Sequence, residues 1–172
     1  MFNNIQADFR NHGRRFGSLG FWALIVYRFG RWRYTIANRW LRKPFSMLYH
    51  VAFKWIQIVT GIEIPCEVPI GDGFVIDHHG GIIVSGYARF GSNCRIRAGV
   101  VVGLARVDDP AAPNIGDNVD IGVGAKLLGR IQVGDNVMIG ANAVVVRDVP
   151  ANHVAVGVPA TFKPLSPRKP AP

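Results

Sequence analysis

Two adjacent histidines beside an acid and two glycines are the residues of this chain best suited to chemistry. They lie in the segment Ile76-Asp77-His78-His79-Gly80-Gly81. A histidine titrates near neutrality and can take a proton from an alcohol, provided that a carboxylate fixes its tautomer. Glu63, in Gly61-Ile62-Glu63-Ile64-Pro65, is the best candidate for that carboxylate. The pattern predicts that His78 activates a hydroxyl group, and a purely structural role for the histidine is the simpler alternative.

The elements that must position these residues follow from a six-residue repeat that runs from residue 70 to residue 150. A branched apolar residue, usually followed by a small one, recurs once in six, as in Ile115-Gly116-Asp117-Asn118 and Val133-Gly134-Asp135-Asn136. This period fits neither an α-helix nor a half-buried strand. It is typical of a three-sided coil in which each hexad forms one side. The two quoted segments are three hexads apart, so we expect them to stack on consecutive coils.

The charge of the chain is concentrated at its beginning. The 172 residues are about one domain's length, and 49% of them are apolar, which is enough for a core. Residues 1–60 contain ten Lys and Arg but only one acid, Asp8, and thereby hold the whole net charge of +9. This predicts a negatively charged partner, such as an anionic membrane surface or a phosphorylated molecule, with a solvated basic face as the alternative. We expect no nucleic-acid binding, because no recognised nucleic-acid-binding pattern accompanies the charge.

The first sixty residues are expected to be helical. The apolar run from Leu19 to Tyr27 is too short to span a bilayer, which needs roughly 20 residues. Two helices are predicted over about 19–40 and 45–59, separated by Lys43-Pro44, with tryptophans set among arginines. Such a segment either caps the open end of the coil or lies at a membrane interface, and both can hold. Because no signal peptide is recognisable, we expect a cytoplasmic protein, with peripheral contact at the inner face of the membrane as a further option.

The sequence predicts three consecutive parts of the chain. We expect a helical segment over 1–60, a β-helix over 61–150 with a protruding loop at 103–114, and a C-terminal tail over 151–172. The last part of this tail, from residue 163 to residue 172, is expected to be disordered or to lie along a neighbour. Cys66 and Cys94 form neither a metal pair nor a disulfide framework and are expected to be packed free thiols.

The repeat resembles that of the hexapeptide-repeat acyltransferases. Residues 61–160 are similar to the serine acetyltransferase branch of this family, and more so to bacterial polysaccharide acetyltransferases of the colanic acid type. The motifs that carry the likeness are Gly61-Ile62-Glu63-Ile64, residues 70–78, Gly124-Ala125-Lys126 and Val156-Gly157-Val158-Pro159-Ala160. The resemblance implies a mainly β fold, a left-handed parallel β-helix with an N-terminal α-helical segment, that assembles as a homotrimer.

The resemblance also implies roles for individual residues. His78 corresponds to the general base and Glu63 to the acid paired with it. Asp77 and Asp8 correspond to acids of the acceptor pocket, while His79 has no counterpart and either contacts the acceptor or flanks the turn. Acetyl-CoA is implied as the acetyl donor, bound between two subunits, and no metal is implied. The residues that correspond to coenzyme A contacts are Gly103, Leu104, Val123 and Ala141.

The loop over 103–114 bears on the acceptor. Serine acetyltransferases have an Arg-His pair just before its proline, whereas this chain has Ala111-Ala112-Pro113. A free amino acid brings a carboxylate that needs a cation, which Arg106 could supply, whereas a sugar hydroxyl needs only hydrogen-bond partners and space. We therefore predict an O-acetyltransferase that acts on a carbohydrate or lipid-linked sugar in exopolysaccharide biosynthesis, with serine O-acetylation for cysteine biosynthesis as the alternative.

Two other classes of protein use the same architecture. A non-catalytic trimeric scaffold is compatible with the repeat, although the presence of Glu63 and His78 argues against it. A zinc carbonic anhydrase would need three converging histidines, and His78, His79 and His153 are the only histidines in the repeat region or its exit. Because His153 lies beyond the last hexad, zinc chemistry is not expected.

Overall fold

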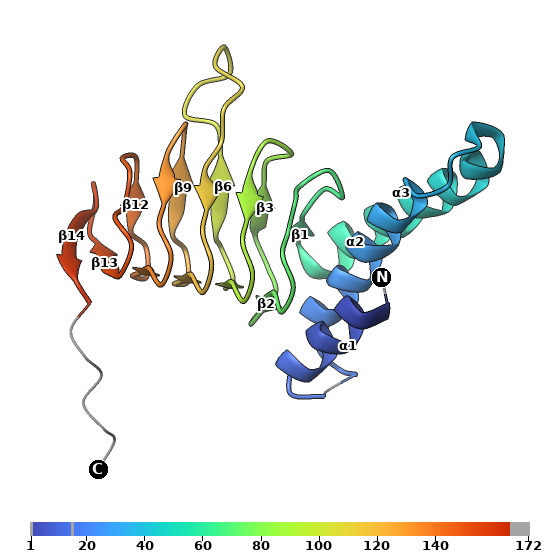
Figure 1. The fold of residues 1–172 in the computed structure, drawn as a ribbon, viewed down its shortest axis with the longest axis horizontal. Coiled ribbons are helices and arrows are strands. Elements are labelled where there is room, and N and C mark those ends of the chain that lie inside the picture. The colour runs from blue at the N-terminus through green and yellow to red at the C-terminus, as the bar shows by residue number, and fades with distance from the viewer. Residues whose placement is uncertain (1, 15, 166–172) are drawn as a thin grey trace.

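The computed structural model describes residues 2–14 and 16–165, which form three helices followed by a parallel β-helix (Figure 1). The helices are α1 (Phe2–Asn11), α2 (Leu19–Arg33) and α3 (Arg39–Thr60). No helix in the described part of the chain is long and apolar enough to cross a membrane. The helices lie at one end of the β-helix, and α3 extends away from it.

The β-helix has three sides, each of them a sheet of short strands. The strands of one side are β1 (Ile62–Glu63), β3 (Ile82–Val84), β6 (Val101–Gly103), β9 (Lys126–Leu128) and β12 (Val144–Val145). A second side consists of β4 (Arg89–Phe90), β7 (Asn114–Ile115) and β10 (Gln132–Val133). The third consists of β2 (Val75–Ile76), β5 (Arg95–Ile96), β8 (Asp120–Ile121), β11 (Met138–Ile139), β13 (His153–Val156) and β14 (Thr161–Pro164). The predicted mainly β fold is thereby confirmed.

The hexad repeat sets the register between coils. Ile115 pairs with Val133, as the spacing of three hexads predicts, and the paired strands are parallel. The apolar residue of each hexad points into the coil, and these side chains form one continuous core that is almost free of solvent contact. Burial of this apolar column provides the main stabilisation of the β-helix, since each fully buried aliphatic side chain contributes about 1.5–3 kcal/mol.

A ladder of asparagines turns one corner of the coil. Asn93, Asn118 and Asn136 all have a positive φ of 56–57°, a left-handed conformation that asparagine tolerates better than most residues. Each amide also donates to the asparagine of the next coil, from Asn93 to Asn118 at 3.3 Å and from Asn118 to Asn136 at 3.2 Å. The same residue type therefore both turns the chain and ties successive coils together.

The first coil departs from this regularity at the corner that contains the two histidines. Ile76 pairs with Ile96 on one side of this corner, and Ile83 pairs with Val101 on the other. Six residues, 77–82, consequently lie between these two paired positions, where four, residues 97–100, suffice in the next coil. Because the strands on both sides are held in register, the two additional residues must bulge outward. We refer to residues 77–81 as the first-corner bulge.

Helix α2 covers the open end of the β-helix. Its Leu24 and Tyr27 belong to the same buried core as the first coil, and the Tyr27 hydroxyl donates to the Val68 carbonyl at 2.6 Å. An open end would otherwise expose apolar core and unpaired strand groups. This arrangement matches the capping role considered for the N-terminal segment.

The predicted helix boundaries were wrong in two respects. The break between α2 and α3 lies at residues 34–38 and not at Lys43-Pro44, which is inside α3. The Asn38 side chain accepts from the Trp40 backbone N–H at 2.9 Å and starts α3, so Pro44 costs one backbone hydrogen bond without ending the helix. Helix α1 was not predicted separately.

The other local predictions have mixed outcomes. A protruding loop joins β6 to β7, as expected (Figure 1). Cys66 and Cys94 are free and buried. The tail is more ordered than predicted, because Lys163 and Pro164 belong to β14, which pairs antiparallel with β13. Residues 166–172 lie outside the described part of the chain.

Candidate functional site

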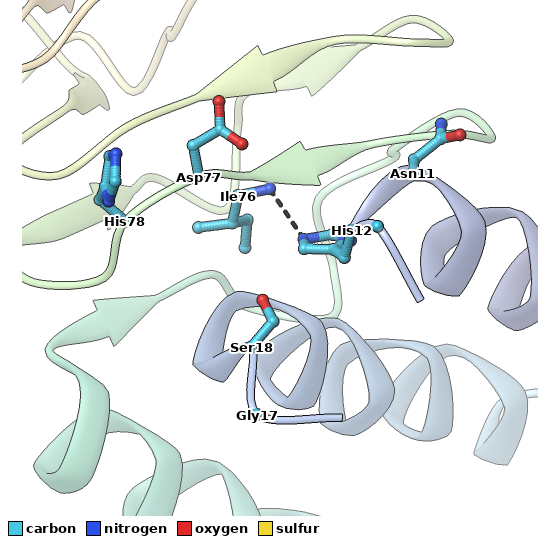
Figure 2. A pocket seen from close by; sticks show the side chains of 8 residues that line it. Asn11, His12, Gly17, Ser18, Ile76, Asp77 and His78 are labelled. Carbon is cyan, nitrogen blue, oxygen red and sulfur yellow. Dashed lines mark hydrogen bonds between the residues drawn. The ribbon is translucent and has the colours of Figure 1, made fainter. Parts of the chain in front are cut away.

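A hollow of about 640 Å³ lies between the helical cap and the first-corner bulge. Figure 2 shows the side chains of the end of α1, the start of α2 and the first coil around this space. Segments from three separate parts of the sequence thus form it. The lining residues are Asn11, His12, Gly13, Gly17, Ser18, Ile76, Asp77 and His78.

His78 is the reactive candidate in this hollow. It is exposed, and its backbone has a positive φ of 58°, which the bulge imposes. Its ring makes no hydrogen bond with any residue that the structure describes. An imidazole without an internal partner, placed at the edge of a hollow, is available to a hydroxyl group of a bound molecule.

Asp77 precedes His78 and is held by two arginines of the second coil. Arg95 Nη1 donates to Asp77 Oδ2 at 2.7 Å, and Arg97 Nη2 lies 3.8 Å from the same oxygen. Arg97 in turn makes a two-pronged ion pair with Asp120 of the third coil. The Asp77 carboxylate is therefore fixed in orientation at the wall of the hollow, with its charge partly balanced.

The start of α2 gives the hollow a positive end. Gly17 and Ser18 line the hollow, and the backbone N–H groups of the first turn of a helix attract negative charge. This helix start sits directly on the strand: a Cβ at Gly20 would lie 2.3 Å from the Ile76 carbonyl oxygen. Only glycine permits this approach, so Gly20 brings the helix start next to Asp77 and His78.

His12 fastens α1 to the wall of the hollow and was not found by sequence analysis. Its Nε2 accepts from the Ile76 backbone N–H at 3.1 Å (Figure 2). Its Nδ1 lies 2.7 Å from the Asp8 carbonyl oxygen. Because a backbone N–H can only donate, Nε2 carries no proton and Nδ1 must be the donor. His12 is thus a neutral imidazole that links two backbones. No spacing or motif in the sequence marks it.

Glu63 does not contact His78 in the described structure. It lies on β1 and lines a separate hollow of about 380 Å³ together with Gly61, Gly81 and Ile82. No hydrogen bond or ion pair joins it to His78 among the described residues. The two hollows border opposite ends of the first-corner bulge, so the pairing of Glu63 with His78 stays a prediction.

Asp8 lies beneath the hollow and does not line it. Its side chain is 1% exposed, and its two oxygens accept from Arg28 Nε at 3.0 Å and Arg28 Nη2 at 3.3 Å. Arg28 also donates to the carbonyls of Ile70 and Gly71. Burial raises the pKa of the Asp8 carboxyl above its usual range, while Arg28 acts in the opposite direction. The structure thus gives Asp8 a structural task, holding α1 to α2, and an acceptor contact stays a prediction.

The remaining predicted residues are distributed around the first-corner bulge and along the coils. His79 is exposed and lines a smaller hollow of about 240 Å³ with Ser18 and His78. Val123 and Ala141 stack at the same corner of successive coils, where the Asn142 N–H donates to the Val123 carbonyl. Gly103 ends β6 and Leu104 begins the protruding loop. Their contact with coenzyme A stays a prediction.

Arg106 does not reach the hollow as an anchor. It donates through Nε and Nη2 to Asp108, two residues away in the same exposed loop, at 3.0 and 2.9 Å. Within the described residues, no group of three or more His, Cys, Asp or Glu side chains is arranged to hold a metal ion.

Comparison with known proteins identifies the family. The profile of the bacterial transferase hexapeptide (six repeats) matches residues 112–147. The chain is 35% identical to the serine acetyltransferase of Synechococcus elongatus over 173 residues, which cover 92% of this chain and 67% of that protein. The chain belongs to the serine acetyltransferase family. It spans 56% of the length of the serine acetyltransferase of Mycobacterium tuberculosis and 79% of that of Helicobacter pylori J99.

Solved structures of serine acetyltransferases support the same assignment. The Neisseria gonorrhoeae serine acetyltransferase matches with a TM-score of 0.81 and 30% identity, covering 98% of this chain and 67% of that one. A serine acetyltransferase in complex with CoA matches with a TM-score of 0.75 and 29% identity, covering 93% of this chain and 66% of that one. The predictions of an acyltransferase and of acetyl-CoA as its co-substrate are confirmed.

The prediction of a sugar acceptor in exopolysaccharide biosynthesis was wrong. The relatives and structures described above are serine acetyltransferases, and the expected closeness to polysaccharide acetyltransferases of the colanic acid type has no support. The sequence argument assumed that a carboxylate anchor must come from the protruding loop. In the structure, the start of α2 borders the hollow, and Arg95 and Arg97 contact the Asp77 carboxylate.

Replacing Arg28 tests the structural role of the buried pair beneath the hollow. Arg28→Met leaves the Asp8 carboxylate buried without its partner, so we expect the free energy of unfolding to fall by about 3–5 kcal/mol at pH 7. Burial raises the pKa of Asp8 in the folded state, so the lone carboxylate takes up a proton as the pH falls. The deficit relative to wild type should therefore shrink between pH 7 and pH 4, as measured by urea unfolding.

The double variant Asp8→Asn/Arg28→Met is the matched control for this experiment. It removes the stranded charge and should recover part of the lost stability. If the free energy of unfolding of Arg28→Met were within 1 kcal/mol of the wild-type value at pH 7, the structural role assigned to the Asp8–Arg28 pair would be contradicted.

Proposed function

We propose that this protein transfers the acetyl group of acetyl-CoA to the hydroxyl of L-serine. The proposal rests on one structural observation within the established family: an exposed histidine, His78, that makes no hydrogen bond to any described residue and lies in a bulge that the repeat does not require. His78, with Asp77 before it and the start of α2 across the hollow, offers a base, an anion and a positive helix end. The base would meet the serine hydroxyl, the Asp77 carboxylate would meet the ammonium, and the helix start would meet the serine carboxylate.

The proposed reaction is a direct transfer. His78 takes the hydroxyl proton as the serine oxygen attacks the thioester carbonyl carbon of acetyl-CoA. The carbonyl π electrons move to oxygen and form a tetrahedral oxyanion, which backbone N–H groups would stabilise. The oxyanion collapses, the carbon–sulfur bond breaks, and the thiolate of coenzyme A receives the proton from His78. O-acetylserine and coenzyme A are the products.

The proposal includes an oligomeric state and a binding place for acetyl-CoA. We propose a homotrimer, with acetyl-CoA in a groove between two β-helices and the backbone near Gly103, Leu104, Val123 and Ala141 along it. Val123 and Ala141 are exposed at one stacked corner, which leaves their backbones accessible to a ligand. Glu63 is proposed to orient His78, which requires a side-chain movement from its present hollow. His79 is left without an assigned role.

An assay of coenzyme A release tests the activity. Purified full-length protein with acetyl-CoA should release coenzyme A in the presence of L-serine, and His78→Gln should lower kcat by at least 10²-fold, since general base catalysis contributes 10²–10⁴-fold. The matched control is His153→Gln, which changes a histidine of β13 far along the coil. Absence of serine-dependent release, or equal rates for His78→Gln and wild type, would refute the proposal.

A second experiment tests how the acceptor is held. If Asp77 binds the serine ammonium, Asp77→Asn should raise the KM for serine about tenfold or more, because the lost interaction is a charge-assisted hydrogen bond. Glycerate carries a hydroxyl in place of the amino group, and its KM should change little. Asp108→Asn, in the exposed loop, is the control. Equal effects of Asp77→Asn on both acceptors would contradict the assignment.

A further inference from the structure

A second, strongly basic hollow lies at the other end of the helical cap. It has a volume of about 280 Å³ and is formed where α2 ends and α3 begins, whereas the start of α2 borders the candidate active site. Four of its six lining residues are cationic and the other two carry hydroxyl groups. No acid among the described residues lines it, although Glu67 beside it accepts from the Tyr34 hydroxyl at 2.9 Å. The lining residues are Arg33, Tyr34, Arg39, Arg42, Lys43 and Ser46.

Arg33 at the floor of this hollow has an unsatisfied donor. Its side chain is 7% exposed, with Nη1 donating to Ser46 Oγ at 2.9 Å and Nη2 to Tyr34 Oη at 3.0 Å. Its Nη2 also lies 3.7 Å from Glu67 Oε1 in an ion pair. Its Nε is buried and has no hydrogen-bond partner among the described residues. Because this Nε has almost no contact with solvent, a ligand in the hollow would meet the more exposed cations Arg39, Arg42 and Lys43 instead. A phosphate group has the charge and the several oxygens that such a cluster of donors fits.

An exposed apolar face adjoins the hollow along α3. We call it the α3 apolar face, and it consists of Trp40, Leu41, Met47, Leu48, Val51 and Trp55. Met47 is 70% exposed and Trp55 66%, which is unusual for large apolar side chains gathered on one helix. Lys43 links this face to the hollow, since its Nζ lies 3.9 Å from the centre of the Trp40 ring.

The charge of the helical segment before β1 indicates what covers the α3 apolar face. No acidic residue occurs between Asp8 and Glu63, while ten Lys and Arg do. A second copy of the same face would bring cations against cations, whereas an anionic bilayer offers both negative headgroups and apolar chains. A helix with an apolar face, tryptophans and flanking bases is typical of one that lies in the membrane interface.

The geometry points to a membrane-docking surface at the α2–α3 end of the protein. The basic hollow binds the phosphate of an anionic phospholipid, and the α3 apolar face rests in the interface between headgroups and acyl chains. This binding is independent of the acceptor used at the first-corner bulge, because α2 separates the two hollows.

Flotation with lipid vesicles tests the inference. The full-length protein should float with vesicles of phosphatidylcholine and phosphatidylglycerol in a 3:1 ratio, and not with phosphatidylcholine alone. Arg42→Gln/Lys43→Gln should lower the partition coefficient roughly thirtyfold, since each basic residue near the surface contributes about a factor of five. Arg89→Gln/Arg130→Gln removes the same charge from the β-helix and should change it less than threefold. Met47→Glu/Val51→Glu should abolish flotation.

Two other occupants of this surface, a soluble phosphate and a second copy of the chain, would give results that overturn the inference. Failure to float with anionic vesicles, combined with stabilisation by inorganic phosphate that Arg42→Gln/Lys43→Gln removes, would identify a site for a soluble phosphate. A smaller assembly of Met47→Glu/Val51→Glu in light scattering would show that the face is a contact between copies. Equal loss of flotation in both charge variants would mean that net charge alone binds the vesicles.

Discussion

The ladders that flank the first corner of the β-helix are the constraint on which the candidate site depends. Ile76 and Ile83 are each paired with the next coil, so the ends of the corner cannot move apart. Six residues lie between these positions where four suffice in the next coil, and the excess leaves the regular path outward. The left-handed conformation of His78 belongs to this bulge. The repeat thus provides a rigid frame, and one local excess of chain length places a reactive side chain on its surface.

The helical cap turns that bulge into a site. Gly20 lets the start of α2 touch the Ile76 carbonyl, and His12 joins α1 to the Ile76 N–H, so two helices meet at the residue just before Asp77. The buried Asp8–Arg28 pair fixes α1 and α2 to each other and to the first coil. Each contact is structural in itself, yet together they set the distance between the helix start, the acid and His78. The same α2 ends at the basic hollow, so one helix connects the two surfaces that bear on function.

The fold was predictable from sequence because it follows from a local period, and the site was only partly so. Hexad spacing alone gave the pairing of Ile115 with Val133, and the break in the pattern at residues 76–81 located His78 and Asp77. His12 lies 64 residues from its partner Ile76, and no local pattern encodes such a contact. The sugar acceptor was inferred from two alanines in the loop and from the likeness to polysaccharide acetyltransferases, whereas the structure places Arg95 and Arg97 beside Asp77. The break at residues 34–38 was missed because Pro44 is a more conspicuous signal than the capping side chain of Asn38.

A crystal structure of the protein with coenzyme A and L-serine tests the central claim most directly, because the claim concerns which side chain the reacting hydroxyl meets. The account predicts the serine hydroxyl within hydrogen-bond distance of the His78 ring, with the ammonium at Asp77 and the sulfur of coenzyme A on the same side of the first-corner bulge. Serine ordered at another place in the protein, with its hydroxyl away from His78, would contradict the account.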